Sequence, residues 1–588
     1  MLSSKSSRFY IDYATADQCV CEDAARILRT RIQSRCGVVY DRGNPQFVLT
    51  LKQDRALSPE SFVIELPAAN SAVIRGLDKL GILYGAGRFL RDCTFHEQGF
   101  STGLWTGTSR PAKPVRGIYL ATHFHNYYHD APVEQIIEYL EELALWGFNV
   151  VQVWFDMHHY TDIDDPKARR MIDRLKRILV GARRIGMRVC LVNLGNEAFA
   201  DSPVELRADF NTGRSIYRCE LCPSKPKARE LLLQWFNEVL DAFAEVQPDF
   251  IAFGPYDQGG CACGNCAPWG SNGYLKICEA KARLLKSRWP DAKVILSTWL
   301  FDLEHDQGEW RGLADVFARG VDWCDYIQAD SHTNYPEFPL TQGVPGHLPL
   351  LNFPEISMWE MHPWGGFGAN PLPSRFQRLW QTVKSEVSGG FPYSEGLFED
   401  INKVLCARFY WDPDRSADSI LREYIAYEYS PDVVEEVIEA IDILEANHNH
   451  SWYVDWRLCR QIRRPIRFRK DPRRAYELIK QADARLTANA RGRWRWRILY
   501  LRALIDQELA PYEGYWGNEV CESAFEELTE IYHAQKAETT LAPPTRRARR
   551  HLRTSENDFY IKEGIKSGLI DLDSENMPIV GLTDTQDD

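Results

Sequence analysis

The segment Pro132–Phe155, PVEQIIEYLEELALWGFNVVQVWF, contains one complete helix-to-strand unit. Its first part has proline in the opening helical turn and apolar side chains at Ile136, Leu140 and Leu143, which share one helix face. A glycine ends this helix, and the run Phe148–Phe155 that follows is typical of a strand buried on both faces. An amphipathic helix that leads directly into a buried strand predicts parallel βα architecture.

The same pattern recurs along the chain. Helical segments fit between successive apolar runs, as at Pro166–Ile185, Lys227–Glu245 and Gly273–Trp289. The predicted strands are Val115–Ala121, Phe148–Phe155, Met187–Asn193, Asp249–Phe253, Lys293–Trp299, Asp325–Ala329, Leu348–Phe353 and Gly390–Tyr393. Parallel strand–helix units repeated over about 300 residues are typical of a (β/α)8 TIM barrel. We therefore predict an α/β fold of this class.

The regions on either side of the barrel have different patterns. Short apolar strands at Phe47–Leu51 and Phe62–Leu66, together with helical runs, predict a small α+β accessory domain before the barrel. Helical periodicity without a strand-like run predicts an α-helical domain after it. The predicted boundaries are 1–108 for the accessory domain, 109–410 for the barrel, 411–540 for the helical domain and 541–588 for a loosely held tail. Any homodimer is expected to form through the helical domain.

Composition narrows the class of partner. The chain has 82 acidic against 70 basic residues, a net charge of −12, and this acidity argues against a nucleic-acid-binding surface. No run of about 18 apolar residues occurs, so we expect no membrane-spanning helix. The first residues, Met1–Arg8, lack the apolar centre of a secretory signal. These features predict a cytoplasmic protein with reduced cysteines and no nucleic-acid or membrane partner.

Polar and aromatic side chains follow the predicted strands. Functional residues of a parallel barrel lie at the carboxyl ends of its strands, where their loops converge. Carboxylates, imidazoles, amides and indoles in one place suit a sugar, whose hydroxyls need hydrogen bonds and whose C–H faces stack on flat rings. The residues that we expect to bind substrate are His123, His125, Trp154, Asp156, Asn196, Trp299, His332, Tyr393 and Glu395.

Three carboxylates are candidates for catalysis. Cleavage of a glycosidic bond needs one carboxyl group that donates a proton and another that activates water or attacks carbon. Asp257 follows the fourth strand and precedes a sharp glycine turn, and we assign it as the acid. Asp330 and Glu355 follow the sixth and seventh strands, and we expect Glu355, assisted by Asp330, to be the base. A turn cap or a salt bridge is the structural alternative for each, and Glu197 is a rival acid.

The chain contains a cysteine cluster directly after Asp257. Cys261, Cys263 and Cys266 form a Cys-x-Cys-x-x-Cys motif, and Cys222 lies upstream. Four thiolates can hold a tetrahedral structural zinc that fixes the fourth βα loop. A disulfide or packed thiols are the alternatives, and an iron–sulfur cluster is less favoured because nothing else indicates electron transfer. No cofactor is expected to be required for catalysis.

Several segments resemble known glycoside hydrolases. Gly81-Ile82-Leu83-Tyr84-Gly85 resembles the accessory domain that precedes the barrel in family 67 α-glucuronidases and family 20 hexosaminidases, and Val115–Tyr119 resembles their first barrel strand. Pro255–Cys263 and Tyr393–Lys403 are similar to segments of uncharacterised bacterial proteins with an α-glucuronidase-type N-terminal domain. The resemblance covers roughly residues 40 to 540.

The resemblance to family 67 implies an inverting reaction with the acid at Asp257 and the water served by Asp330 and Glu355. This chain departs from that family because its acid position holds Asp rather than Glu. It also lacks the paired Asp-Glu of family 20, since Gln258 follows Asp257. A uronic acid would further need cations for its carboxylate, and the resemblance leaves Arg116 and Lys403 for that role.

Together these features predict an exo-acting O-glycosyl hydrolase of α-glucuronidase-like type. Its expected substrate is an oligosaccharide or glycoside from which it removes a terminal sugar or uronic acid. Three alternatives remain open: an inactive barrel that binds glycans or acts as a scaffold, a family 20-like hexosaminidase, and a barrel enzyme with a metal at its rim histidines.

Overall fold

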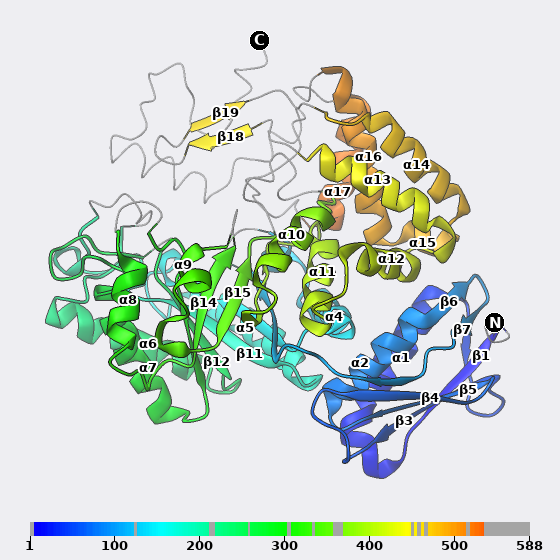
Figure 1. The fold of residues 1–588 in the computed structure, drawn as a ribbon, viewed down its shortest axis with the longest axis horizontal. Helices are drawn as coiled ribbons and strands as arrows, with labels where there is room; N and C mark the ends of the chain where they lie inside the picture. Colours follow the sequence, from blue (N-terminus) through cyan, green and yellow to red (C-terminus); the bar gives the residue numbers. More distant parts are fainter. Residues whose placement is uncertain are drawn as a thin grey trace.

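The computed structural model describes residues 5–122, 126–210, 218–256, 259–302, 307–331, 335–356, 368–448, 452–455, 460–463, 468–512 and 518–533. Figure 1 shows a mixed sheet with helices at the N-terminus in blue, a barrel in cyan to green, and a group of helices in yellow to orange. No helix in these ranges is long and apolar enough to cross a bilayer.

The N-terminal part is a six-stranded sheet covered by helices. Its strand order is β2-β1-β3-β5-β4-β8, parallel from β2 to β5 and antiparallel at β4. Gly85 lets a helix lie against the sheet, since a Cβ there would come within 2.4 Å of the Ile74 side chain. The elements are β1 (Arg8–Asp12), α1 (Gln18–Arg35), β2 (Val39–Tyr40), β3 (Phe47–Gln53), β4 (Phe62–Ala68), β5 (Ser71–Gly76), α2 (Lys79–Asp92), β6 (Cys93–His96), β7 (Gly99–Thr102) and β8 (Gly107–Ser109).

The middle of the chain is a closed parallel barrel, which confirms the predicted fold class. Strand pairing runs from β10 through β16 to β9, and β9 pairs with β10 to close the ring. The eighth strand is split into β16 and β17, which both pair with β9. The strands are β9 (Val115–Leu120), β10 (Val150–Trp154), β11 (Arg188–Leu194), β12 (Phe250–Gly254), β13 (Lys293–Ser297), β14 (Tyr326–Ser331), β15 (Leu350–Pro354), β16 (Val387–Gly390) and β17 (Tyr393–Ser394).

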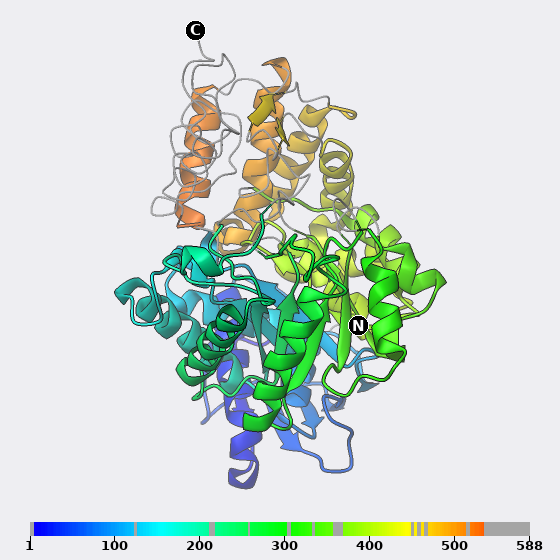
Figure 2. The same ribbon diagram turned by 90° about the vertical axis from the view of Figure 1, so that its left-hand side faces the viewer.

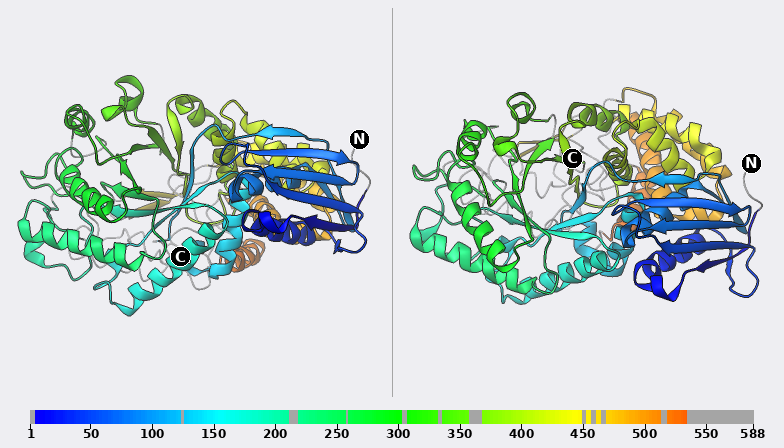
Figure 3. Two further views of the ribbon diagram at one scale, coloured as in Figure 1. Left: turned by 90° about the horizontal axis from the view of Figure 1, so that it is seen from below. Right: turned by 60° about the horizontal axis from the view of Figure 1, so that its bottom comes forward.

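Helices surround the barrel, as both views in Figure 3 show. In the described part of the connection between β14 and β15, the α-helix has five residues and is followed by a short 3-10 helix at Pro345–His347, so this unit is irregular. The helices of this part are α3 (Tyr127–Asp130), α4 (Val133–Trp146), α5 (Pro166–Arg184), α6 (Pro226–Ala242), α7 (Gly273–Arg288), α8 (Glu309–Phe317), α9 (Glu337–Thr341), α10 (Pro373–Val383) and α11 (Asp400–Trp411).

The C-terminal part is helical, but it also contains a β-hairpin. Strands β18 (Trp452–Asp455) and β19 (Arg460–Arg463) pair antiparallel, which corrects the expectation that no strand interrupts the helices. Each strand has only four residues and β19 is largely polar, so the apolar run of β18 is too short to predict a strand by itself. Figure 2 shows the helices stacked beside the barrel. They are α12 (Ala417–Glu428), α13 (Val434–Ala446), α14 (Pro472–Arg485), α15 (Ala488–Gly492), α16 (Trp494–Leu509) and α17 (Glu519–Ile531).

A buried ion network joins the three parts of the molecule. Arg495 of α16 lies 2.8 Å from Asp400 of α11 and 2.5 Å from Glu142 of α4. Arg35 of the N-terminal α1 pairs with Glu428 of α12 at 2.8 Å, and Glu428 also lies 3.9 Å from Arg495. Because these charges are buried, each depends on its partner to offset the cost of desolvation.

We expect Arg495→Met to lower the free energy of unfolding by about 3–5 kcal/mol, because it leaves buried carboxylates uncompensated. The matched control is Arg474→Met, which breaks an exposed pair with Glu439 and should cost about 0–1 kcal/mol. Urea denaturation measures the unfolding free energy of both variants. Equal losses of unfolding free energy would contradict the claim that the buried network stabilises the protein more than the exposed pair does.

Candidate functional site

Three carboxylates follow barrel strands on the side that faces the barrel axis. Side chains alternate along a strand, so a residue two positions after an inward-facing one also faces inward. Tyr393 belongs to the apolar cluster inside the barrel, and Tyr326 and Phe353 pack against that cluster. Asp330 lies four residues after Tyr326 on β14, while Glu355 and Glu395 lie two residues after Phe353 and Tyr393. All three carboxylates are buried.

Strand pairing brings Glu355 and Glu395 to neighbouring positions. Glu355 extends β15 by one residue and forms a parallel bridge with Tyr393 of β17. The Tyr393 hydroxyl donates to Oε1 of Glu395 at 2.8 Å. Burial, together with the negative charges of Glu395 and Glu355, holds the pKa of Tyr393 well above its usual range. Tyr393 therefore stays protonated and acts as a hydrogen-bond donor to Glu395.

An aromatic layer lies beneath these carboxylates. The ring centroids of Tyr119 and Tyr393 are 5.2 Å apart in an edge-to-face arrangement, and Phe353 lies 6.0 Å from each. Trp154, also in the barrel cluster, is the last residue of β10 and lies one inward-facing position beyond Gln152, the residue that pairs with Tyr119. Trp299 follows β13 and is partly exposed. Rings below and carboxylates above form a surface that suits a sugar ring.

Glu197 fixes Trp154 and the loops around it. The Trp154 indole N–H donates to Glu197 Oε1 at 3.0 Å, and the Met157 and Leu194 backbone N–H groups donate to its two oxygens. Asn193 contributes a further donor to Oε2 at 3.3 Å. Burial raises the pKa of Glu197 to about 7, while these hydrogen bonds act in the opposite direction. Since both oxygens already accept hydrogen bonds, Glu197 is better suited to positioning than to proton donation.

The loop that carries Glu395 is held by a second buried carboxylate. Oε1 of Glu399 accepts from the backbone N–H groups of Glu395 and Gly396 at 3.0 and 3.2 Å, and from the Ser394 hydroxyl. Lys403 lies 3.3 Å from the same oxygen. The sequence showed these residues after the eighth strand, but nothing in the pattern indicated that Glu399 orients Glu395.

Two residues named for uronate recognition are engaged elsewhere. Arg116 begins β9 at the amino end of the barrel, fully buried, where it contacts Glu60 at 2.5 Å and the Gly147 carbonyl oxygen. Lys403 is also fully buried and donates to the hydroxyls of Tyr128 and Tyr139. The expectation that Arg116 binds substrate is therefore corrected: as the second residue of its strand, it lies at the opposite end from the rim.

Asn196 also has a different role from the one expected. Its amide N–H group donates to the carbonyl oxygens of Leu221 and Gly260 at 3.0 and 2.8 Å, and its oxygen accepts from the Gly260 N–H at 2.9 Å. These bonds tie the loop after β11 to the loop after β12. Because backbone groups engage both ends of the amide, Asn196 braces the two loops instead of contacting a sugar.

Asp156 lies in a small cluster with two histidines. The carboxylate is 2.9 Å from Nε2 of His159 and 4.0 Å from Nε2 of His158. One atom from each residue could reach a common metal ion, since the three atoms lie within 4.8 Å of one another. The remaining predicted site residues, His123, His125, Asp257 and His332, lie outside the described residues.

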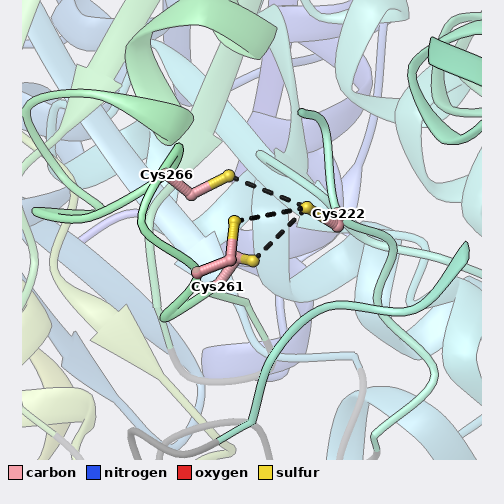
Figure 4. A group of neighbouring side chains, drawn as sticks. Cys222, Cys261 and Cys266 are labelled. Carbon is pink, nitrogen blue, oxygen red and sulfur yellow. Dashed lines mark hydrogen bonds between the residues drawn. The ribbon is translucent and has the colours of Figure 1, made fainter. Parts of the chain in front are cut away.

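The four predicted zinc ligands lie together. Sγ of Cys222 is 3.5 Å from that of Cys261, 3.7 Å from Cys263 and 3.8 Å from Cys266. Figure 4 shows the sulfurs of Cys261 and Cys266 pointing toward Cys222. Hydrogen bonds from Cys261 and Cys266 lower the pKa of the Cys222 thiol. Zn–S bonds of about 2.3 Å in a tetrahedron put the sulfurs about 3.8 Å apart, so these separations fit zinc.

The chain resembles known proteins in its fold. No protein-family model matches the chain, and no curated protein sequence matches it. A family 89 glycoside hydrolase from Clostridium perfringens, solved with GlcNAc-α-1,4-galactose, has a TM-score of 0.61 at 11% identity, covering 88% of this chain and 65% of that one. A GH115 4-O-methyl-α-glucuronidase with specificity for decorated arabinogalactans has a TM-score of 0.58 at 10% identity, covering 90% and 76%. A GH138 enzyme that targets pectin rhamnogalacturonan II gives 0.55 at 10% identity, covering 94% and 74%.

The Glu399–Lys403 pair provides a test of the loop that holds Glu395. Glu399→Gln leaves the buried Lys403 ammonium without its counter-charge, and we expect a loss of about 3–5 kcal/mol in unfolding free energy. The double variant Glu399→Gln/Lys403→Met removes both charges and should cost less than the single change. Urea denaturation of the wild type, both single variants and the double variant gives the coupling free energy between Glu399 and Lys403. If the losses of the two single variants add up to that of the double variant, the two residues do not act as a pair.

Proposed function

We propose that this chain is a glycoside hydrolase that removes a terminal sugar or uronic acid from oligosaccharides or glycosides. The observation that carries the proposal is the placement of Asp330, Glu355 and Glu395 at the carboxyl end of a closed barrel, above the Tyr119 and Tyr393 rings. The fold shared with three glycoside hydrolases supports it. Carboxyl groups that flank a bound sugar are what general acid–base cleavage requires.

In the proposed reaction, Glu355 is the base. It removes a proton from water as the water attacks the anomeric carbon, and Asp330 orients that water. Asp257, on the loop after β12, donates a proton to the leaving oxygen. Glu395, held by the Tyr393 hydroxyl, accepts a hydrogen bond from a sugar hydroxyl. An enzyme with these roles inverts the configuration at the anomeric carbon.

The environment of Arg116 and Lys403 bears on the choice of substrate. Both cations are buried and committed to protein partners, so neither is available to a uronate carboxylate. Among the residues that the structure describes, this favours a neutral terminal sugar over a uronic acid. Activity assays with both neutral and uronic glycosides decide between the two kinds of substrate.

Hydrolysis of a panel of neutral and uronic aryl glycosides tests the proposal. We expect Glu355→Gln, Asp330→Asn and Asp257→Asn each to lower kcat by about 10²–10⁴-fold, the usual contribution of a general acid or base. Glu386→Gln, which changes an exposed carboxylate on the same barrel, should leave kcat unchanged. NMR of the first-formed anomer tests inversion.

Full activity in the Glu355→Gln variant would remove that residue from the mechanism. Glycan binding without turnover of any substrate would instead support the inactive glycan-binding barrel. Turnover that is lost on chelation and restored by a divalent metal would favour chemistry at the Asp156, His158 and His159 cluster.

We also propose that Cys222, Cys261, Cys263 and Cys266 bind a structural zinc ion. Four thiolates fill a tetrahedral site and leave no position for substrate, so the ion would supply stability and no catalysis. The Asn196 bonds to Gly260 already hold the same loop near the cluster. The cysteines that the structure describes are all free of disulfides, so the four sulfurs are available to a metal.

Elemental analysis of protein purified under reducing conditions should give about one zinc per chain. Cys222→Ser should lose the metal and lower the melting temperature, because the site contributes folding energy. Cys219→Ser is the matched control, since Cys219 is buried nearby but its Sγ bonds to the Ala198 carbonyl oxygen. Wild-type protein without bound zinc would eliminate the site.

A further inference from the structure

A cavity of about 410 Å³ lies at the amino end of the barrel, away from the carboxylates. Its walls come from the N-terminal sheet and α2 on one side and from the ends of α4 and α11 on the other. The charged and aromatic residues that matter for its chemistry are Arg88, Arg91, Arg408, Arg415, Trp105 and Trp411. This volume is within the range of about 300–1,000 Å³ that ligand pockets occupy, and interfaces between domains are common places for them.

Positive charge exceeds negative charge in this cavity. Glu423 is the main counter-charge: it lies 2.8 Å from Arg91 and 3.6 Å from Arg88, and it also pairs with Arg415. The surrounding cations hold the pKa of Glu423 well below its usual range, so it is ionised. Asp92 lies 3.7 Å from Arg88, and Asp412 and Arg110, both exposed, line the opening.

Arg408 is the cavity arginine for which the described residues provide no direct ion pair. Its side chain is buried, at 7% exposure, and makes no hydrogen bond or ion pair with any residue in the described ranges. Its guanidinium lies 5.5 Å from the centre of the Trp411 ring. Burial lowers the pKa of Arg408, the negative charge of Glu423 opposes this, and the like charges of Arg91 and Arg415 lower it further, to about 9, which still leaves it charged at neutral pH. Because one carboxylate, Glu423, is shared among four arginines, the buried Arg408 guanidinium is only partly compensated, and a bound anion would lower the remaining cost.

We propose that this cavity binds a small anionic sugar, such as a sugar phosphate or sugar acid, with its charged group against Arg408 and its ring against Trp105 or Trp411. Guanidinium groups suit phosphate and carboxylate, and indole faces suit a sugar ring. The site is separate from the carboxylates at the other end of the barrel. It also borders the last turn of α11, whose first turn follows Glu399, so a bound anion would stabilise the helix that holds the Glu395 loop.

Isothermal titration calorimetry of the full chain at low ionic strength tests this site with four probes: inorganic phosphate, glucose 6-phosphate, glucuronate and uncharged glucose. We expect an anionic sugar to bind more tightly than phosphate, and glucose not to bind. Tighter binding of glucose 6-phosphate indicates a phosphate group, and tighter binding of glucuronate indicates a carboxylate. Absence of binding by both anionic sugars would overturn the proposal.

Arg408→Met distinguishes a ligand site from a structural one. We expect it to weaken binding at least tenfold and to raise the melting temperature of the ligand-free protein, because it removes a buried charge that Glu423 compensates only in part. Arg422→Met, on the exposed face of the neighbouring α12, is the control and should change neither property. If Arg408→Met fails to fold, Arg88→Met, at 25% side-chain exposure, provides the same affinity test. If the variant that folds binds the anionic sugars with wild-type affinity, the cavity arginines do not bind the anion and the proposal is wrong.

Discussion

Closure of the parallel barrel is the constraint on which the proposed site depends. Once β9 pairs with β10, every strand must alternate between the barrel axis and the surrounding helices. The inward positions on β15 and β17 hold Phe353 and Tyr393, and the next inward positions beyond the apolar layer hold Glu355 and Glu395. Strand pairing therefore brings together acidic side chains that are 40 residues apart in sequence. The same pairing places an aromatic surface directly beneath them.

The sequence predicted the features that follow from strand periodicity. Asp330, Glu355 and Glu395 were found because each follows an apolar run, and such runs become barrel strands. Tyr119 and Phe353 were not singled out, because an aromatic residue inside a strand has the same pattern whether it fills a core or supports a ligand.

Roles set by side-chain partners could not be predicted in the same way. Arg116 is at the start of its strand, and only the fold shows that Glu60, from the N-terminal sheet, reaches it there. Asn196 follows a strand, as a sugar ligand would, but its amide is engaged by the backbone of a loop more than 60 residues away. The four-cysteine cluster was predictable because the Cys-x-Cys-x-x-Cys spacing keeps three sulfurs within a short turn. The sulfurs of all four cysteines do lie close together.

Buried charges serve two purposes in this molecule. Arg495, Lys403 and Arg116 each have carboxylate or carbonyl partners, and they connect the parts of the chain. Arg408 differs because it borders a cavity, its Nε atom has no hydrogen-bond partner in the described residues, and it shares the negative charge of Glu423 with three other arginines. This contrast gives the cavity its proposed role, and it is independent of the chemistry at the opposite end of the barrel.

A crystal structure with a bound oligosaccharide tests the central claim most directly. The account predicts a terminal sugar on the Tyr119–Tyr393 surface, with the oxygens of Glu355 and Glu395 at hydrogen-bond distance from the sugar or from a water beside its anomeric carbon. An oligosaccharide bound on another surface, with these carboxylates turned away from it, would contradict the account.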